Sequence, residues 1–146
     1  MPEKETVERA EQDKREGKAP STQAGEFVRE EIEHIREGKH GARSTKQAIA
    51  IGLSKARRAG VDLPAPEKGE ASESTRRQAK RDLRKARTRR KPSRKRSRAT
   101  LTALKREGRS AASKKALSRQ ARSAAAKRSR ASRSRSAKRA AATRKK

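Results

Sequence analysis

The sequence predicts a mostly α-helical protein, with a small helical hairpin followed by a largely disordered or conditionally helical basic tail. Two observations support this fold class. Apolar residues recur at helical spacing most regularly within residues 21–60, and residues 93–146 consist almost wholly of Ala, Ser, Lys and Arg. Hydrophobic residues make up 28% of the chain and aromatic residues 1%. Because so little apolar material cannot offset the entropy of the whole chain, we expect at most one small domain.

Residues 1–20 are predicted to form a charged N-terminal helix or arm. Acidic and basic side chains lie four residues apart, as in Glu5 and Arg9, and each such pair stabilises a helix by about 0.2–0.5 kcal/mol. Gly17 and Pro20 end the segment. Since apolar residues are few, we expect this helix to fray.

The first helix of the hairpin begins near Ser21 or Thr22, either of which suits an N-cap. Gly38 is a natural C-terminal stop. Between these signals, apolar side chains recur at steps of three and four residues and form one face of the helix. The members of this face are Ala24, Phe27, Val28, Ile32 and Ile35.

The second helix should fold back on the first, because the connector over residues 39–43 is short. Ser44 and Gln47 have the spacing of a capping box, in which each side chain bonds the other residue's backbone. Gly52 lies on the apolar face, where it would let two backbones approach closely, and Gly60 ends the helix. We therefore predict a helical hairpin domain over residues 21–60.

Residues 61–73 are predicted to be a linker, because two prolines and a glycine interrupt a polar run. Residues 74–146 form the basic tail. Within it, residues 74–91 have a narrow apolar stripe among many cations. Repulsion among these cations is expected to unwind this segment until phosphate neutralises them, and residues 93–146 are expected to be disordered in the free protein.

The charge distribution is the strongest functional signal. Residues 1–70 carry equal numbers of acidic and basic side chains, so the entire net charge of +28 lies in residues 71–146. A segment that repels itself so strongly requires a polyanion as partner. We therefore predict non-sequence-specific DNA binding and compaction, as in nucleoid-associated or histone-like proteins, through electrostatic contacts with phosphate.

Arg outnumbers Lys in the tail, which favours bidentate contacts with phosphate. The side chains predicted to bind nucleic acid are Arg76, Arg77, Lys80, Arg81, Arg84, Lys85, Arg87, Arg89, Arg90, Lys91, Arg94, Lys95, Arg96, Arg98, Lys114, Lys115, Lys127, Arg128, Arg130, Arg133, Arg135, Lys138 and Arg139.

A further phosphate contact is predicted in the hairpin connector, at Lys39, His40, Arg43 and Ser44. Glycines and basic side chains before a helix N-terminus suit a phosphate held by free backbone N–H groups. The alternative is an ordinary helix–helix turn. The spacing departs from that of a nucleotide-binding P-loop, which argues against nucleotide hydrolysis.

The sequence predicts no catalytic residues, no metal site and no cofactor. Cys is absent, which excludes disulfides and thiolate ligands. His34 follows Glu30 and Glu31 at helical spacing, and we interpret this group as a surface ion pair rather than a metal site. Nothing indicates an apolar pocket in which a catalytic pKa could be tuned, so we predict that the protein is not an enzyme.

Two resemblances add to these predictions. The run STQAGEFVREEI from Ser21 and the block KQAIAIGLSKARRAG from Lys46 resemble a family of small basic bacterial proteins carrying a domain of unknown function. This resemblance implies a bacterial source but no activity or site residues. The tail is similar in composition to the C-terminal arms of linker histones and to bacterial histone-like proteins, which implies DNA condensation by analogy.

Two other functions fit the same chemistry. The chain could be an RNA- or ribosome-associated binding protein, or a protein-interaction module that a basic tail localises. We expect nucleic acid as partner, with DNA favoured over RNA, and a homodimer or protein partner at the 21–60 hairpin. No apolar run resembles a membrane span or signal peptide, so the expected location is the cytoplasm, at the nucleoid.

Overall fold

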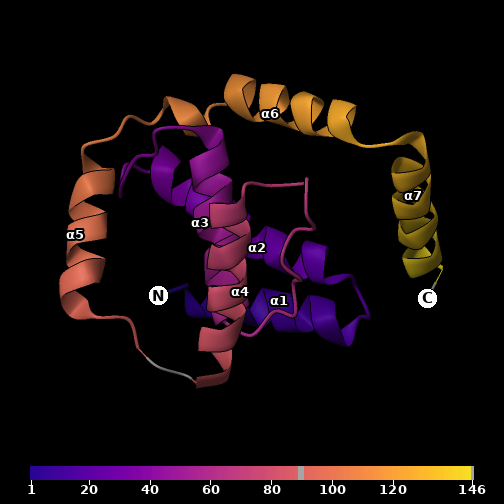
Figure 1. The fold of residues 1–146 in the computed structure, drawn as a ribbon, viewed down its shortest axis with the longest axis horizontal. Coiled ribbons are helices and arrows are strands. Elements are labelled where there is room, and N and C mark those ends of the chain that lie inside the picture. Colours follow the sequence, from indigo (N-terminus) through magenta and orange to yellow (C-terminus); the bar gives the residue numbers. More distant parts are fainter. Residues whose placement is uncertain (89–90, 146) are drawn as a thin grey trace.

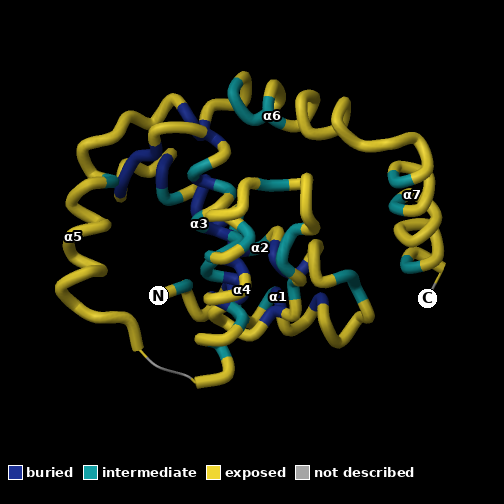
Figure 2. Tube along the Cα trace, viewed as in Figure 1, coloured by how far each residue is buried: buried dark blue, intermediate teal, exposed yellow. Residues whose placement is uncertain are grey.

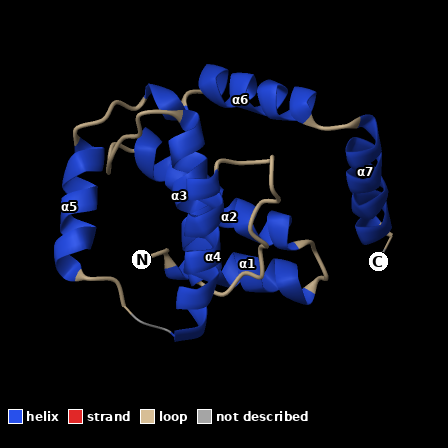
Figure 3. Cartoon of the chain, in the orientation of Figure 1, coloured by secondary structure: helices blue, strands red, loops and turns tan. Residues whose placement is uncertain are grey.

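The computed structural model describes residues 1–88 and 91–145, and within them the protein is all-α (Figures 1 and 3). Its helices are α1 (Lys4–Arg15), α2 (Pro20–Arg36), α3 (Thr45–Arg58), α4 (Glu73–Thr88), α5 (Arg94–Lys105), α6 (Lys114–Lys127) and α7 (Arg130–Arg144). A short 3-10 helix, η1 (Ser110–Ala112), lies between α5 and α6. None of the helices described is long and apolar enough to cross a bilayer.

Helices α1 to α4 form a packed head, in which α1 lies against α2 and α4 lies against α3. The predicted hairpin is confirmed as α2 and α3, which share the largest helix–helix interface. Its centre is Phe27, which packs with Ala10 of α1, Ala24, Ala56 and Val61. Buried residues concentrate in this head and in η1, while the remaining helices are mostly exposed (Figure 2).

The predicted close approach at Gly52 is confirmed. A Cβ atom built on Gly52 would lie 2.6 Å from the Cα atom of Val28 on α2. No real side chain tolerates that distance, so the absence of a side chain at Gly52 sets how closely the two helices pack.

Replacing Gly52 with Ala should destabilise the head by about 1–3 kcal/mol, because the added methyl group forces α2 and α3 apart. Urea unfolding followed by circular dichroism measures this loss. Gly25→Ala is the matched control: it lies in α2, and an added Cβ meets no atom within 4 Å. That variant should gain stability, since Ala is the better helix former by about 0.5–1 kcal/mol. An equal effect at both glycines would contradict the packing.

The expectation of a largely disordered or conditionally helical tail is wrong, because α4 to α7 are helical through Arg144. Local signals explain the difference. Ser113 caps α6 by accepting a hydrogen bond from the Ala116 N–H at 3.2 Å, and Ser129 caps α7 in the same way through Ser132 at 3.1 Å. Ala, Arg and Lys are also among the best helix formers. Together these local terms outweigh the repulsion between solvated cations.

Helix α4 belongs to the head, which is a second departure from the sequence analysis. Asp82 is 1% exposed and accepts hydrogen bonds from Arg58 Nε at 2.9 Å, Ser54 Oγ at 2.7 Å and Gln78 Nε2 at 3.0 Å. Ala79 is buried beside it. Asp82 thus anchors α4 on α3, and the expected unwinding of this segment by charge repulsion is wrong, because α4 is helical over Glu73–Thr88.

The predicted linker over residues 61–73 packs along the surface of the head. Arg57 donates hydrogen bonds to the carbonyl groups of Leu63 at 3.1 Å and Pro64 at 3.2 Å, and Arg76 Nε bonds the Pro66 carbonyl at 3.1 Å. Burial lowers the pKa of Arg57. Two arginines therefore hold this segment along α3 and α4.

The segment after α5 returns to the head and docks on the connector between α2 and α3. The backbone N–H of Gly41 donates to the Leu104 carbonyl at 2.9 Å, and that of Ala42 donates to the Gly108 carbonyl at 3.0 Å. An added Cβ on Gly41 would clash with the carbonyl oxygen of Glu107. We call residues 104–112 the docked segment.

Side chains complete this contact at η1. Arg36 Nε donates to the Ala112 carbonyl at 2.9 Å, and Thr45 Oγ1 donates to the Ala111 carbonyl at 2.7 Å. Ala111 and Ala112 are buried in an apolar cluster with Ile32, Ile35, Ala42 and Ala48. The docked segment thus attaches the second half of the chain to the head through both hydrogen bonds and apolar burial.

Candidate nucleic-acid interface

Helices α5, α6 and α7 form an arc around the head (Figure 1). None of the three has a buried residue in the part of the chain that the structure describes. The arc therefore presents its side chains to solvent along almost its whole length (Figure 2).

The predicted nucleic-acid-binding residues lie on or beside α4 to α7. Those that the structure describes are exposed, except Arg76, which is half-buried and bonds Pro66 and Glu73. Arg89 and Arg90 lie outside the described residues. The same part of the chain has further exposed basic side chains that the sequence analysis did not name: Lys105, Arg106, Arg109, Arg119, Arg122, Arg144 and Lys145.

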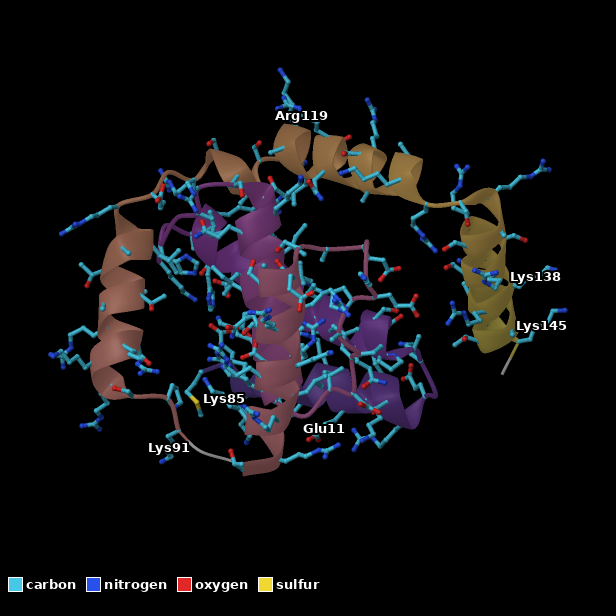
Figure 4. The ribbon with its side chains drawn as sticks, viewed as in Figure 1. Glu11, Lys85, Lys91, Arg119, Lys138 and Lys145 are labelled. Atoms are coloured by element: carbon cyan, nitrogen blue, oxygen red, sulfur yellow. The ribbon has the colours of Figure 1, made fainter. Side chains whose placement is uncertain are left out.

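Most of these cations have no anionic partner among the residues that the structure describes. Arg76 and Arg77 pair with Glu73, at 2.7 and 3.3 Å. Among the described residues, no cation between residues 91 and 145 lies within 4.0 Å of a carboxylate. In Figure 4 the side chains of Arg119 and Lys138 point away from the ribbon. Their charges are therefore free to meet an external polyanion.

A shallow groove of about 640 Å³ lies where α7 faces the turn between α1 and α2. Arg128, Arg139 and Arg144 line one side, and Lys18 lines the other. Lys18 already pairs with Asp13 and Glu16, at 2.7 Å each. The three arginines therefore supply the uncompensated positive charge of the groove.

The connector residues predicted to contact phosphate are only partly brought together. Lys39 is exposed and pairs with Glu37 at 3.0 Å and Glu3 at 3.3 Å, contacts that raise the pKa of Lys39. His40, in contrast, is buried. The exposed surface of the connector is thus formed by Lys39 and Arg43, and His40 points into the head.

The predicted capping box is half formed. Ser44 Oγ accepts a hydrogen bond from the Gln47 N–H at 3.1 Å, as expected, but Gln47 Oε1 accepts from the N–H of Arg43 at 2.8 Å rather than from that of Ser44. The N–H groups of Gly41 and Ala42 bond the docked segment. Phosphate binding at the connector remains a prediction. It would depend on side chains more than on the backbone N–H groups of Gly41, Ala42 and Arg43, because these three groups already have partners.

An ionic cluster lies beneath the connector, and the sequence analysis missed it. Glu30 and Glu31 are 2% and 1% exposed, although their spacing suggested surface groups. Lys55 of α3 lies 3.4 Å from Glu30 and 2.6 Å from Glu31. His40 Nε2 lies 2.8 Å from Glu31 Oε1. Residues from α2, the connector and α3 meet here, so spacing within one helix could not reveal the cluster.

His34 forms an ion pair at the edge of this cluster, but with a different partner from the one expected. Its Nε2 atom lies 2.8 Å from Glu3 Oε1. This hydrogen bond, together with the contact from Lys39, lowers the pKa of Glu3. Glu3 precedes α1, so the N-terminal segment covers the connector side of the head.

Comparison with known proteins identifies part of the chain. No curated protein and no solved structure matches it. Residues 4–68 match the model of a family of unknown function, DUF6496. The match covers α1 to α3 and the start of the following loop, and it leaves out α4 to α7. Residues 4–68 are therefore similar to the DUF6496 domain of unknown function, as the predicted resemblance implied, and no comparison supports the predicted likeness of the tail to histone-like proteins.

Proposed function

We propose that this protein binds DNA without sequence specificity, through phosphate contacts made by the exposed cations of α4 to α7, and compacts it at the nucleoid. The observation that carries the proposal is the set of cations between residues 91 and 145, which lack carboxylate partners in the described structure. Neutralising phosphates with such cations releases counterions, and this release drives non-specific binding.

The helical form of the tail bears on how binding occurs. A helix rises 1.5 Å per residue, so cations along α5, α6 and α7 are held at fixed spacings. Because these side chains are already ordered on helices, less backbone entropy is lost on binding than a disordered tail would lose. The docked segment divides the cations into α4 and α5 before it and α6 and α7 after it. A protein with two basic surfaces, one before and one after the docked segment, is suited to bridge two separate stretches of duplex DNA.

Duplex DNA is favoured over single-stranded RNA for a structural reason. Recognition of single strands depends on aromatic side chains that stack with bases. The chain has one aromatic residue, Phe27, and it is 1% exposed at the centre of the head. Phosphate contacts, which a duplex offers at high density, are therefore the chemistry that this surface supports.

The test is to titrate the full chain with duplex DNA, structured RNA and heparin at matched charge and several salt concentrations. We expect duplex DNA to bind at least as tightly as RNA. Arg133→Glu combined with Lys138→Glu should weaken DNA binding and reduce its salt dependence. The matched control is Lys14→Glu with Lys46→Glu, the same change of charge on exposed residues of α1 and α3, within the electrically neutral residues 1–70. RNA binding that is more than tenfold tighter at equal salt would show that RNA is the target.

A further inference from the structure

The ionic cluster beneath the connector contains both histidines of the chain. Ligand-type atoms of Glu31, His34 and His40 all lie within 4.8 Å of one another. The protein has no other histidine. Glu31 and His40 are buried, whereas the side chain of His34 is 14% exposed. The group therefore has a buried floor and one side that small solutes can reach.

The hydrogen bonds of His40 indicate which species this group of side chains would bind. Its Nδ1 atom lies 3.0 Å from the carbonyl oxygen of Gly41, so Nδ1 carries a hydrogen and donates it. The other ring nitrogen, Nε2, is 2.8 Å from Glu31 Oε1. In a neutral imidazole of this tautomer, Nε2 presents a lone pair to the carboxylate oxygen, and the two repel each other. A proton between the two atoms, or a metal cation bound by both, has to relieve that repulsion.

A backbone carbonyl on the distal ring nitrogen is also the usual second partner of a metal-binding histidine. It fixes the tautomer and the ring orientation and increases the basicity of the ligating nitrogen. The connector supplies this carbonyl through Gly41, the residue directly after His40. His40 is thus held with Nε2 facing the Glu31 carboxylate, so that both groups can bind the same metal ion.

The charges around Glu31 favour a cation as well. Glu30 and Glu31 are both buried, and Lys55 is the ammonium group that contacts both. Glu30 also accepts the backbone N–H of Glu3 at 3.0 Å, so the positive charge still needed in the cluster is the one between Glu31 and His40. Glu31 Oε2 lies 2.6 Å from Lys55 Nζ, so Lys55 occupies one oxygen of Glu31, while the other oxygen, Oε1, faces His40 Nε2 at 2.8 Å.

We propose that Glu31, His34 and His40 bind one divalent transition-metal ion, with Zn²⁺ as the best match to the ligands. Two imidazoles and one carboxylate form an established ligand set for zinc, with a fourth position left for water. Magnesium and calcium prefer oxygen ligands throughout, so two histidines disfavour them. Glu3, whose Oε1 lies 2.8 Å from His34 Nε2, stands at the exposed side of the site.

The ion would join the end of α2 to the connector. The same connector receives the docked segment through Gly41 and Ala42. A metal that binds the folded protein but not the unfolded chain increases the free energy of unfolding. The bound ion would therefore brace the surface on which the second half of the chain is held. This role is independent of the partner that the basic helices bind.

The test uses the full chain labelled with ¹⁵N, stripped with a chelator and titrated with ZnCl₂ at pH 7.5. With two histidines, the ring nitrogens give few signals, and each can be assigned. We expect metal-dependent shifts at both rings that saturate at one ion per chain, together with a rise in the thermal unfolding midpoint. Co²⁺ should give the visible absorption of a four- or five-coordinate ion.

Variants separate this site from other binding. His34→Ala should lower zinc affinity at least tenfold, and because His34 is partly exposed, its helix content in chelator should match that of the parent. Glu33→Gln is the control, since Glu33 is exposed on the same helix and pairs with Arg29 at 3.2 Å. It should bind zinc as the parent does. The proposal is wrong if zinc leaves the ring signals unchanged, if His40 keeps two ring protons when zinc is present, or if His34→Ala binds zinc equally well.

Discussion

Raising monovalent salt from about 50 mM to about 200 mM should weaken binding of this protein to duplex DNA by at least ~10³-fold. Each neutralised phosphate contributes about −0.9 to the slope of log K against log salt, and six to ten such contacts give a loss of this size. The exposed helices α5, α6 and α7 carry more than enough unpaired cations for that number. Fluorescence anisotropy with a labelled duplex at several salt concentrations measures the slope.

The control for this prediction is a chain that ends after residue 112. It keeps the head and the docked segment and removes α6 and α7. We expect weaker binding and a shallower slope, because fewer counterions are released. If the full chain shows a slope near zero, phosphate contacts do not drive the binding. If the shortened chain has the same slope as the full chain, α6 and α7 do not take part.

Gly41→Ala should abolish docking of residues 104–112. The new methyl group meets the carbonyl oxygens of Glu107 and Gly108, which are backbone atoms and cannot rotate away. Gly41 itself does not adopt a positive φ, so Ala can take up the same backbone conformation without strain. The four hydrogen bonds of the docked segment are lost with it, at about 1 kcal/mol each.

Hydrogen exchange over residues 104–117 measures this loss, and trypsin cleavage after Arg106 and Arg109 should accelerate. The matched control is Gly108→Ala, because a Cβ on Gly108 meets no atom within 4 Å. That variant should exchange and cleave as the parent does. Parental exchange rates in Gly41→Ala would contradict the docking, whereas faster exchange in both variants would mean that this segment tolerates no change of sequence.

The hairpin was predictable because most of its signals are local, although the predicted cap by Ser21 or Thr22 is wrong, since α2 begins at Pro20 without a side-chain cap. Ser44 caps α3, Gly38 follows α2, and Gly52 lies where two backbones meet, and all three are visible from spacing alone. The prediction of a disordered tail is wrong because capping by Ser113 and Ser129 stabilises α6 and α7 more than repulsion among their cations destabilises them. Capping acts over one turn at a fixed geometry, whereas repulsion between solvated charges is screened.

The remaining contacts of the head involve residues far apart in the sequence. Asp82 is one acidic residue in a basic run, and nothing in its spacing shows that it meets Arg58 of another helix. Ala111 and Ala112 lie in an Ala- and Ser-rich stretch without periodicity, so their burial had no sequence signal. The basic surface could be predicted from composition, because exposure and charge are enough to define it.

The docked segment also changes the mechanics of α5. One end of α5 follows α4, which Asp82 anchors to the head, and the other end is held at the connector. A segment restrained at both ends explores a small volume, so under the proposed function we expect a high effective concentration of its cations near a duplex bound elsewhere on the protein. Among the described residues, no hydrogen bond of the backbone restrains α7 against the head in this way. We therefore expect equal charges on α5 and α7 to differ in effect, with those of α5 engaging the duplex first.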